Sequence, residues 1–228
     1  MTGVEMRLST KSYPALGHRE ITFNYDETHI PDVHAKWFLR FLEDEVASGA
    51  RYLPGQTLQV GWSITLIKEH PDGALGVFEA DMKSMPMNFV DSVTNTLIDL
   101  RSQKYVLDSL GFEIPEFFPS MRQSGVVCDN LSSSALFSIF RADPQRGHDS
   151  GWSICCDDSD HNHNDPQVLS CVSLYEIGCR YPSLIQYLAL PAGIAIYGAG
   201  GNAPAIYLHE EERRPSEGSY LARLWARE

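Results

Sequence analysis

Every second residue is apolar over positions 56–68, in the first half of the chain. The apolar positions are Leu58, Val60, Trp62, Ile64 and Leu66. A period of two predicts a single strand with one buried face. Residues 70–73 supply turn-forming residues, and 74–81 are predicted as the strand that returns beside the first.

Helical spacing of apolar residues predicts two helices around this strand pair. The first begins at Asp32, which can cap it, and ends at about Ser48, before Gly49. Its predicted inward side chains are Trp37, Phe38, Phe41, Leu42 and Val46. The second helix falls between Val90 and Gly111. With an earlier strand at 21–25, the order β-α-β-β-α predicts an antiparallel sheet with helices on one face.

A segment without helical or strand periodicity, 115–120, contains two prolines and marks the predicted domain boundary. The predicted domains are residues 1–118 and residues 119–228, the latter with a charged C-terminal tail. In the second domain strands are predicted at 126–128, 135–141, 151–156, 194–197 and 205–208, and a helix is predicted to begin near Pro182. The predicted fold class is α+β, with two small domains, each a mostly antiparallel sheet with helices packed on it.

The charge balance excludes several classes of partner. The chain has 18 Lys and Arg against 30 Asp and Glu, a net charge of −12. Direct binding of nucleic acid or of an anionic membrane needs a clustered basic face, so neither is expected. The five cysteines are an odd number for a disulfide framework, and no signal-like apolar stretch opens the sequence. We therefore expect a cytoplasmic protein with reduced thiols.

Half of the net negative charge falls between Asp143 and Glu176. That window holds seven acidic residues and one basic residue, Arg146, which leaves six net negative charges. Concentrated charge of one sign destabilises a folded protein and is useful mainly for steering or docking a partner of opposite sign. The alternative is that it serves solubility alone. A second acidic run, 43–45, is expected to be solvated helix surface.

Residues 155–165 bring thiols, imidazoles and carboxylates together, but their spacing disfavours a metal site. Cys155 and Cys156 are adjacent in a predicted strand and should point to opposite faces. As a calcium loop starting at Asp158, the segment has His163 where glycine is required and Leu169 where the closing glutamate is required. We therefore predict a solvated acidic loop, with no metal and no cofactor.

Catalytic templates also fit poorly, so an enzyme is not expected. The three residues 148–150 carry the letters of a Ser-His-Asp triad, but consecutive residues cannot form that relay. The glycines at 198–201 run into Pro204 without the helix that a phosphate-binding loop needs. An enzymatic or metal-dependent module using Cys155, His161 and His163 is kept as an alternative, as is a scaffold or regulatory module with another basic partner.

One ordered set of motifs resembles a known family. Asp149-Ser150-Gly151-Trp152 follows an Arg-containing strand at 137–141, and an aromatic-proline helix start at 181–188 and Pro191-Ala192-Gly193 come behind it. Over about 124–198 the chain resembles a small bacterial domain, once of unknown function, that is now classed among immunity proteins of polymorphic toxin systems. The pair Cys155-Cys156 departs from that family's pattern, and the resemblance does not extend to the first half of the chain.

The resemblance implies a protein that binds and blocks a cognate toxin and catalyses nothing. A two-part chain of this size is most similar to the immunity partner of a DNase toxin of the His-His nuclease type, delivered by type VI secretion. An acidic protein can occupy the basic groove that such a toxin presents to DNA. The predicted toxin-binding residues are Asp149, Trp152, Asp157, Asp158, Asp160, His161, His163 and Asp165. For Trp152 burial beside the sheet is the alternative, and for Asp149 the capping of a turn.

Overall fold

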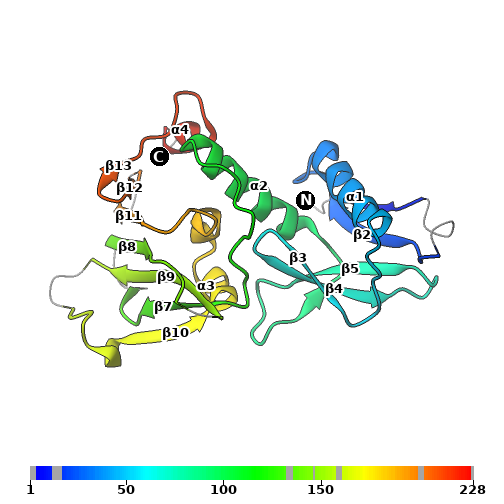
Figure 1. Cartoon of the computed structure of the whole chain (residues 1–228), viewed down its shortest axis with the longest axis horizontal. Coiled ribbons are helices and arrows are strands. Elements are labelled where there is room, and N and C mark those ends of the chain that lie inside the picture. Colours follow the sequence, from blue (N-terminus) through cyan, green and yellow to red (C-terminus); the bar gives the residue numbers. More distant parts are fainter. Residues whose placement is uncertain are drawn as a thin grey trace. The chain divides into compact units, whose positions relative to one another are not determined.

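The computed structural model divides into two compact units, Met1–Arg101 and Ser102–Glu228, each built on one mixed sheet (Figure 1). It describes residues 4–11, 17–131, 136–145, 147–157, 161–199 and 203–226. The α+β fold class is confirmed. The compact units divide inside a helix, whereas the sequence places the boundary at residue 118. As the limit of an independently folding domain, that boundary stays a prediction.

The sheet of the first unit has the strand order β1-β2-β5-β4-β3, with β6 paired to β5. Its elements are β1 Glu5–Ser9, β2 Ile21–Asp26, α1 Asp32–Ala47, β3 Thr57–Val60, β4 Ser63–Glu69, β5 Leu75–Ala80 and β6 Phe89–Val90. β2 and β5 pair in parallel, and the other described pairs of this sheet are antiparallel. Strands β1 and β6 were not predicted from the sequence.

The predicted single strand over 56–68 is wrong, because this segment folds back on itself as a hairpin. Val60 pairs with Ser63, and the two residues between them form the turn. Gly61 has a φ of +60°, which suits the first position of such a two-residue turn. The buried phase shifts after the turn: Ile67 is fully buried, whereas Leu66 is half-buried.

Both predicted helices of the first half are present. In α1, Phe38, Leu42 and Val46 are buried as predicted, but Trp37 is 40% exposed. The second helix, α2, spans Thr94–Ser109. Its first turn is stabilised from β5, where the buried carboxylate of Glu79 accepts hydrogen bonds from the backbone N–H groups of helix residues 95 and 96. A carboxylate at this end complements the unpaired N–H groups and the helix dipole.

The sheet of the second unit has the order β10-β7-β9-β8-β11-β12-β13. Its strands are β7 Ser124–Cys128, β8 Leu136–Arg141, β9 Asp149–Cys156, β10 Leu169–Ser173, β11 Ile194–Ala199, β12 Ala205–Leu208 and β13 Glu211–Glu212. Its helices are η3 Pro166–Val168, α3 Leu174–Arg180, η4 Pro182–Tyr187 and α4 Tyr220–Trp225. β10 and α3 were not predicted, and the helix predicted near Pro182 is the 3₁₀ helix η4.

One face of this second sheet forms the core of the unit. Ile139, Ile154, Ile196 and Ile206 lie in neighbouring strands, pair side by side and are at most 1% exposed. β7 and β9 run in parallel, so their C-terminal ends lie at the same edge of the sheet. Each of these strands ends in a buried cysteine. Among the described residues, no helix combines the length and the apolar character that a membrane span requires.

Candidate functional site

The Asp149–Trp152 motif forms a dense set of hydrogen bonds at the start of β9. The carboxylate of Asp149 accepts from the backbone N–H groups of Gln145 at 2.8 Å and Gly151 at 2.9 Å. These two bonds hold the pKa of Asp149 below its usual value. The hydroxyl of Ser150 donates to the carbonyl of Ser124 in β7 at 2.6 Å. The capping role considered for Asp149 is therefore the one it has in the fold.

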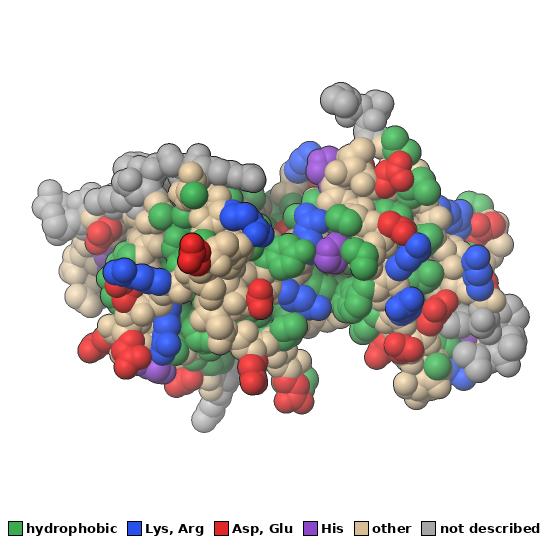
Figure 2. Space-filling view, turned by 90° about the horizontal axis from the view of Figure 1, so that it is seen from above, with side chains coloured by type: hydrophobic (Ala, Val, Ile, Leu, Met, Phe, Trp, Pro, Cys, Tyr) green, Lys and Arg blue, Asp and Glu red, His purple; other side chains and the backbone are tan. Residues whose placement is uncertain are grey.

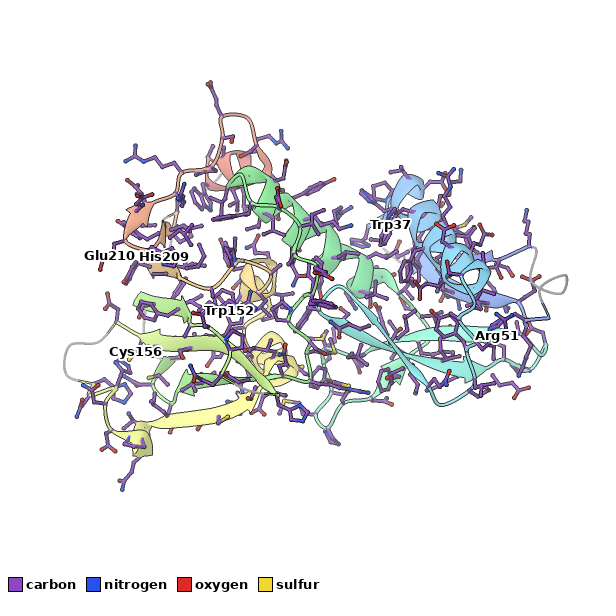
Figure 3. All side chains as sticks on the ribbon, in the orientation of Figure 1. Trp37, Arg51, Trp152, Cys156, His209 and Glu210 are labelled. Carbon is purple, nitrogen blue, oxygen red and sulfur yellow. The ribbon has the colours of Figure 1, made fainter. Side chains whose placement is uncertain are left out.

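Trp152 lies inside the second unit (Figure 3) and is 1% exposed. Its indole N–H donates to the carbonyl of Leu188 at 3.1 Å, and the Arg141 guanidinium lies over its ring, 5.6 Å from the centroid. Its side chain is not accessible in this structure, and contact of Trp152 with a toxin stays an untested prediction. The burial beside the sheet that was considered as the alternative is the packing observed here.

The predicted acidic contacts fall into three groups. Asp157 is exposed just after β9, and Asp143 from the same charged window is exposed as well. Asp165 is half-buried and caps η3 by accepting from the N–H of Gln167 at 2.9 Å. Asp158 and Asp160 lie outside the described residues. Hydrogen bonds from neutral N–H groups leave the charge of Asp149 and Asp165 in place, so these carboxylates still contribute to the local negative potential.

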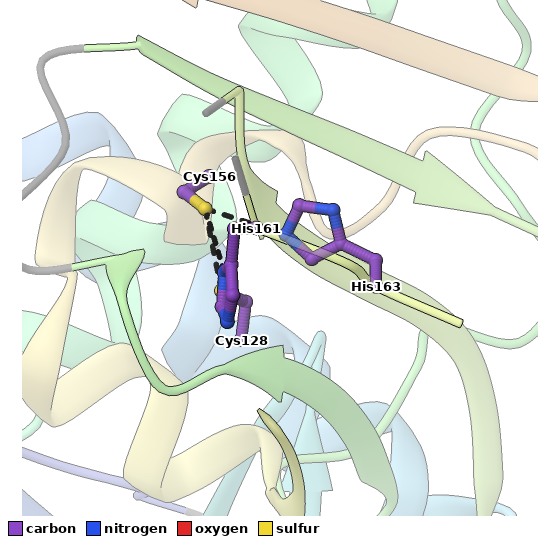
Figure 4. A group of neighbouring side chains, drawn as sticks. All are labelled: Cys128, Cys156, His161 and His163. Atoms are coloured by element: carbon purple, nitrogen blue, oxygen red, sulfur yellow. Dashed lines mark hydrogen bonds between the residues drawn. The ribbon is translucent and has the colours of Figure 1, made fainter. Parts of the chain in front are cut away.

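The two predicted histidines meet two cysteines at the edge of the sheet (Figure 4). The Sγ atoms of Cys128 and Cys156 are 3.5 Å apart. His161 Nδ1 lies 3.1 Å from each of them, and His163 Nε2 lies 3.3 Å from Cys156 Sγ. All four atoms are within 4.8 Å of one another. The histidines therefore turn these nitrogens toward the thiols. Both cysteines are buried and both histidines are half-buried.

The membership of this cluster differs from the sequence-based alternative, which used Cys155. The expected alternation holds within β9, and Cys156 joins the cluster while Cys155 does not. Burial, together with neighbouring Cys128 and Cys156, raises the pKa of the Cys155 thiol. The second thiol comes from Cys128, 28 residues before Cys156, which sequence reasoning missed. The parallel pairing of β7 with β9 brings these strand ends together, and no local sequence pattern predicts that pairing.

Three aromatic side chains gather on the sheet face opposite the isoleucine core. Phe140 and Tyr197 have ring centroids 5.6 Å apart, and Tyr197 and Tyr207 are 5.8 Å apart. Phe140 is 37% and Tyr197 43% exposed. We call Phe140, Tyr197 and Tyr207 the aromatic patch. A surface pocket lined in part by its two tyrosines also includes Glu210, which lies in the turn after β12 (Figure 3).

Comparison with known proteins gives one match. Residues 102–208 match the family model of the Imm33-like domain. This stretch begins where the second compact unit begins, and it contains the motif, the Cys/His cluster and the aromatic patch. No curated protein and no solved structure matches the chain. The match supports an immunity-protein family for the second unit. It does not concern the Asp-Ser-Gly-Trp motif or the type of toxin.

Proposed function

We propose that this protein is an immunity protein that binds and neutralises a cognate antibacterial nuclease toxin, docking an acidic surface on the toxin's basic substrate groove. The observation that carries the proposal is the Imm33-like match over residues 102–208, which contains the whole acidic window. A domain class that exists to block toxins and a local excess of six negative charges together favour a basic target. Delivery of the toxin by type VI secretion is part of the same proposal and rests on the sequence resemblance.

The location of the charge supports docking over general solubility. On the face in Figure 2, acidic and basic side chains are interspersed, so the acidic excess is not a uniform coat. Asp143 is exposed in the connection between β8 and β9, and Asp157 is exposed directly after β9. Both residues lie inside the matched stretch. A nuclease has to attract phosphate, and an acidic surface in the same groove competes with DNA by the same long-range attraction.

The aromatic patch supplies the short-range part of the proposed contact. Exposed tyrosines are enriched among the residues that carry most of the binding energy in protein interfaces. On the outer sheet face, Tyr197 pairs with Ser138 of β8, and Ser138 pairs with Cys155 of β9. Asp157 follows two residues after Cys155, while Glu210 lies at the pocket on the other side. The patch is therefore flanked by carboxylates, as expected for docking on a basic protein.

Co-expression tests the proposed function directly. The gene for an immunity protein should lie beside a gene whose product ends in a toxin domain. We expect this chain to rescue cells that express that toxin, to suppress the accompanying DNA damage, and to form a stable complex with it on purification. Undiminished killing and DNA damage, at levels of soluble protein equal to those of the toxin, would overturn the proposal.

Charge reversal tests the docking surface. We expect Asp143→Lys combined with Asp157→Lys to slow association with the toxin by about 10-fold or more at low salt, and to flatten the dependence of the rate on salt. The matched control, Glu27→Lys with Asp44→Lys, changes the net charge equally at exposed positions of the first unit. Stopped-flow association rates across a salt series give the comparison. Equal rates for the two double variants would remove the acidic window from the mechanism.

A further inference from the structure

We propose a structural Zn²⁺ site in the second unit, with four protein ligands: Cys128, Cys156, His161 and His163. The ligand atoms are the two Sγ atoms, Nδ1 of the first histidine and Nε2 of the second. The site follows from the geometry of these side chains and does not depend on the proposed immunity function.

Four of the six distances among these atoms are close to those of a tetrahedral zinc site, and the other two are at most 4.8 Å. Bond lengths of about 2.3 Å for Zn–S and 2.0–2.1 Å for Zn–N give tetrahedral edges of about 3.8 Å between two sulfurs and about 3.6 Å between sulfur and nitrogen. The S–S distance here is 3.5 Å, and the three short S–N distances are 3.1, 3.1 and 3.3 Å. Each needs to lengthen by only a few tenths of an ångström to admit the ion.

Hydrogen bonds among the four side chains explain their arrangement less completely than a bound metal ion does. If both ring nitrogens act as acceptors, two thiols supply two protons for the four short contacts. A metal ion accepts a lone pair from every one of the four atoms at once. The backbone N–H of Asn130 also donates to the Sγ of Cys128 at 3.4 Å. Such outer hydrogen bonds stabilise a thiolate and are typical of the surroundings of metal-bound sulfur.

The choice of ligands selects the metal and its role. Two thiolates and two imidazoles with tetrahedral spacing favour zinc over the hard cations Mg²⁺ and Ca²⁺, which prefer oxygen ligands. Four protein ligands fill the coordination shell, and zinc sites that are closed in this way are structural, whereas catalytic sites keep one position for water. The proposed site therefore adds no enzymatic activity.

For the fold, the ion would attach a loop to the edge of the sheet. Two ligands end adjacent parallel strands and two lie in the segment between β9 and η3, so the ion joins that segment to the edge of the sheet. Two thiolates cancel the double charge of the ion, so the site is electrically neutral. The negative charge of Asp157 and Asp165 is therefore retained. The ion would anchor this segment through His161 and His163 without reducing its negative charge.

Elemental analysis of the purified full-length chain tests the proposal. We expect about one zinc per chain after expression and purification without chelator. Cys156→Ser should weaken zinc binding more than about 100-fold, beyond the usual loss on removing an outer-shell partner. Cys155→Ser is the matched control, because it changes the adjacent thiol that is outside the cluster, and it should keep the full zinc content.

A second measurement keeps the test decisive if Cys156→Ser fails to fold. Reconstitution of the wild-type chain with Co²⁺ should give the visible absorption of tetrahedral cobalt and a near-ultraviolet thiolate band, both lost on adding excess zinc. Folded, reduced wild-type protein that takes up neither metal would overturn the site, as would loss of zinc from the Cys155→Ser variant alone. Neither result needs the toxin. A zinc-loaded chain that fails to neutralise its toxin would instead contradict the proposed function.

Discussion

At Gly151 the backbone has a φ of +77°, and a Cβ atom added there would lie 2.1 Å from the carbonyl oxygen of Ala142. Both the backbone conformation and the space therefore require glycine. The neighbouring residues are also engaged by the fold: Asp149 accepts two backbone N–H groups, Ser150 bonds to β7, and Trp152 is buried. At the scale of residues, the motif that carries the family resemblance holds β9 in place and leaves no side chain fully exposed.

Replacing Gly151 should destabilise the fold more than replacing another glycine of positive φ. We expect Gly151→Ala to lower the free energy of unfolding by at least about 2 kcal/mol, because strain and a backbone clash add together. Gly147→Ala is the control, since Gly147 also has a positive φ of +52° but no atom within 4 Å of its added Cβ. Urea denaturation measures both. Equal losses for the two variants would assign the whole effect to φ and none to the clash.

A buried acid in the first unit should make stability depend on pH. Burial, as the largest cause, raises the pKa of Asp99 to about 7, although its carboxylate accepts a hydrogen bond from the Trp62 indole at 3.1 Å. The folded state then keeps a proton that the unfolded state loses above about pH 4. This contribution to stability therefore falls as pH rises from about 4 to 7 and is constant above that range.

Asp99→Asn removes that dependence while keeping an acceptor for the indole. Relative to wild type, we expect the variant to gain up to about 3 kcal/mol of unfolding free energy between pH 5 and pH 8. Chemical denaturation of both proteins at the two pH values gives the difference, in which other titrating groups largely cancel. Parallel pH profiles would show that Asp99 ionises in the folded protein as it does in the unfolded chain.

At the scale of elements, the sequence predicted what local periodicity controls. The helix at Asp32–Ala47 was correct because its apolar spacing is helical, and the strand at Ala205–Leu208 was correct because it is a short apolar run that follows turn-forming residues. The hairpin at Gly61 was missed because alternation continues through its turn. β10 was missed because its residues are half-buried or exposed without alternation. His161 and His163 were singled out as site residues, but Cys128 was not, since only the non-local β7–β9 pairing brings it to them.

The outer face of β8, β11 and β12 should contribute to toxin affinity. We expect Tyr197→Ala to weaken binding by about 1–2 kcal/mol, or roughly 5- to 30-fold, through lost contact of an exposed aromatic ring. Tyr105→Ala is the control: Tyr105 is 40% exposed, close to the 43% of Tyr197, but lies on α2. Calorimetric titration with the toxin gives both dissociation constants. An unchanged constant for Tyr197→Ala would place the aromatic patch outside the interface.

For the whole molecule, the boundary predicted at 118 and the division at 101 lead to different expectations about which fragments fold. The C-terminal half of α2 packs within the second unit, where Gln103 donates to the carbonyl of Ile185 at 3.0 Å and Val106 and Leu107 are buried. Ser109 is bonded there as well, accepting from the N–H of Leu221 at 3.2 Å. These contacts belong to the same unit as the proposed toxin-binding surface.

We therefore expect fragment 102–228 to unfold cooperatively and fragment 119–228 to be much less stable, since the shorter one lacks several buried side chains. Thermal melts followed by circular dichroism, on both fragments at equal zinc and protein concentration, give the comparison. Equal melting temperatures would favour the boundary at 118.

The Asp149–Trp152 motif has a further consequence for how chains of this kind diverge. Because the fold engages all four of its residues, their structural roles alone can account for the motif, and it need not specify the target. Two chains can therefore share it and neutralise unrelated toxins. The identity of the target should instead vary with exposed positions such as Asp143, Asp157 and Tyr197, which can change during evolution without unfolding the domain.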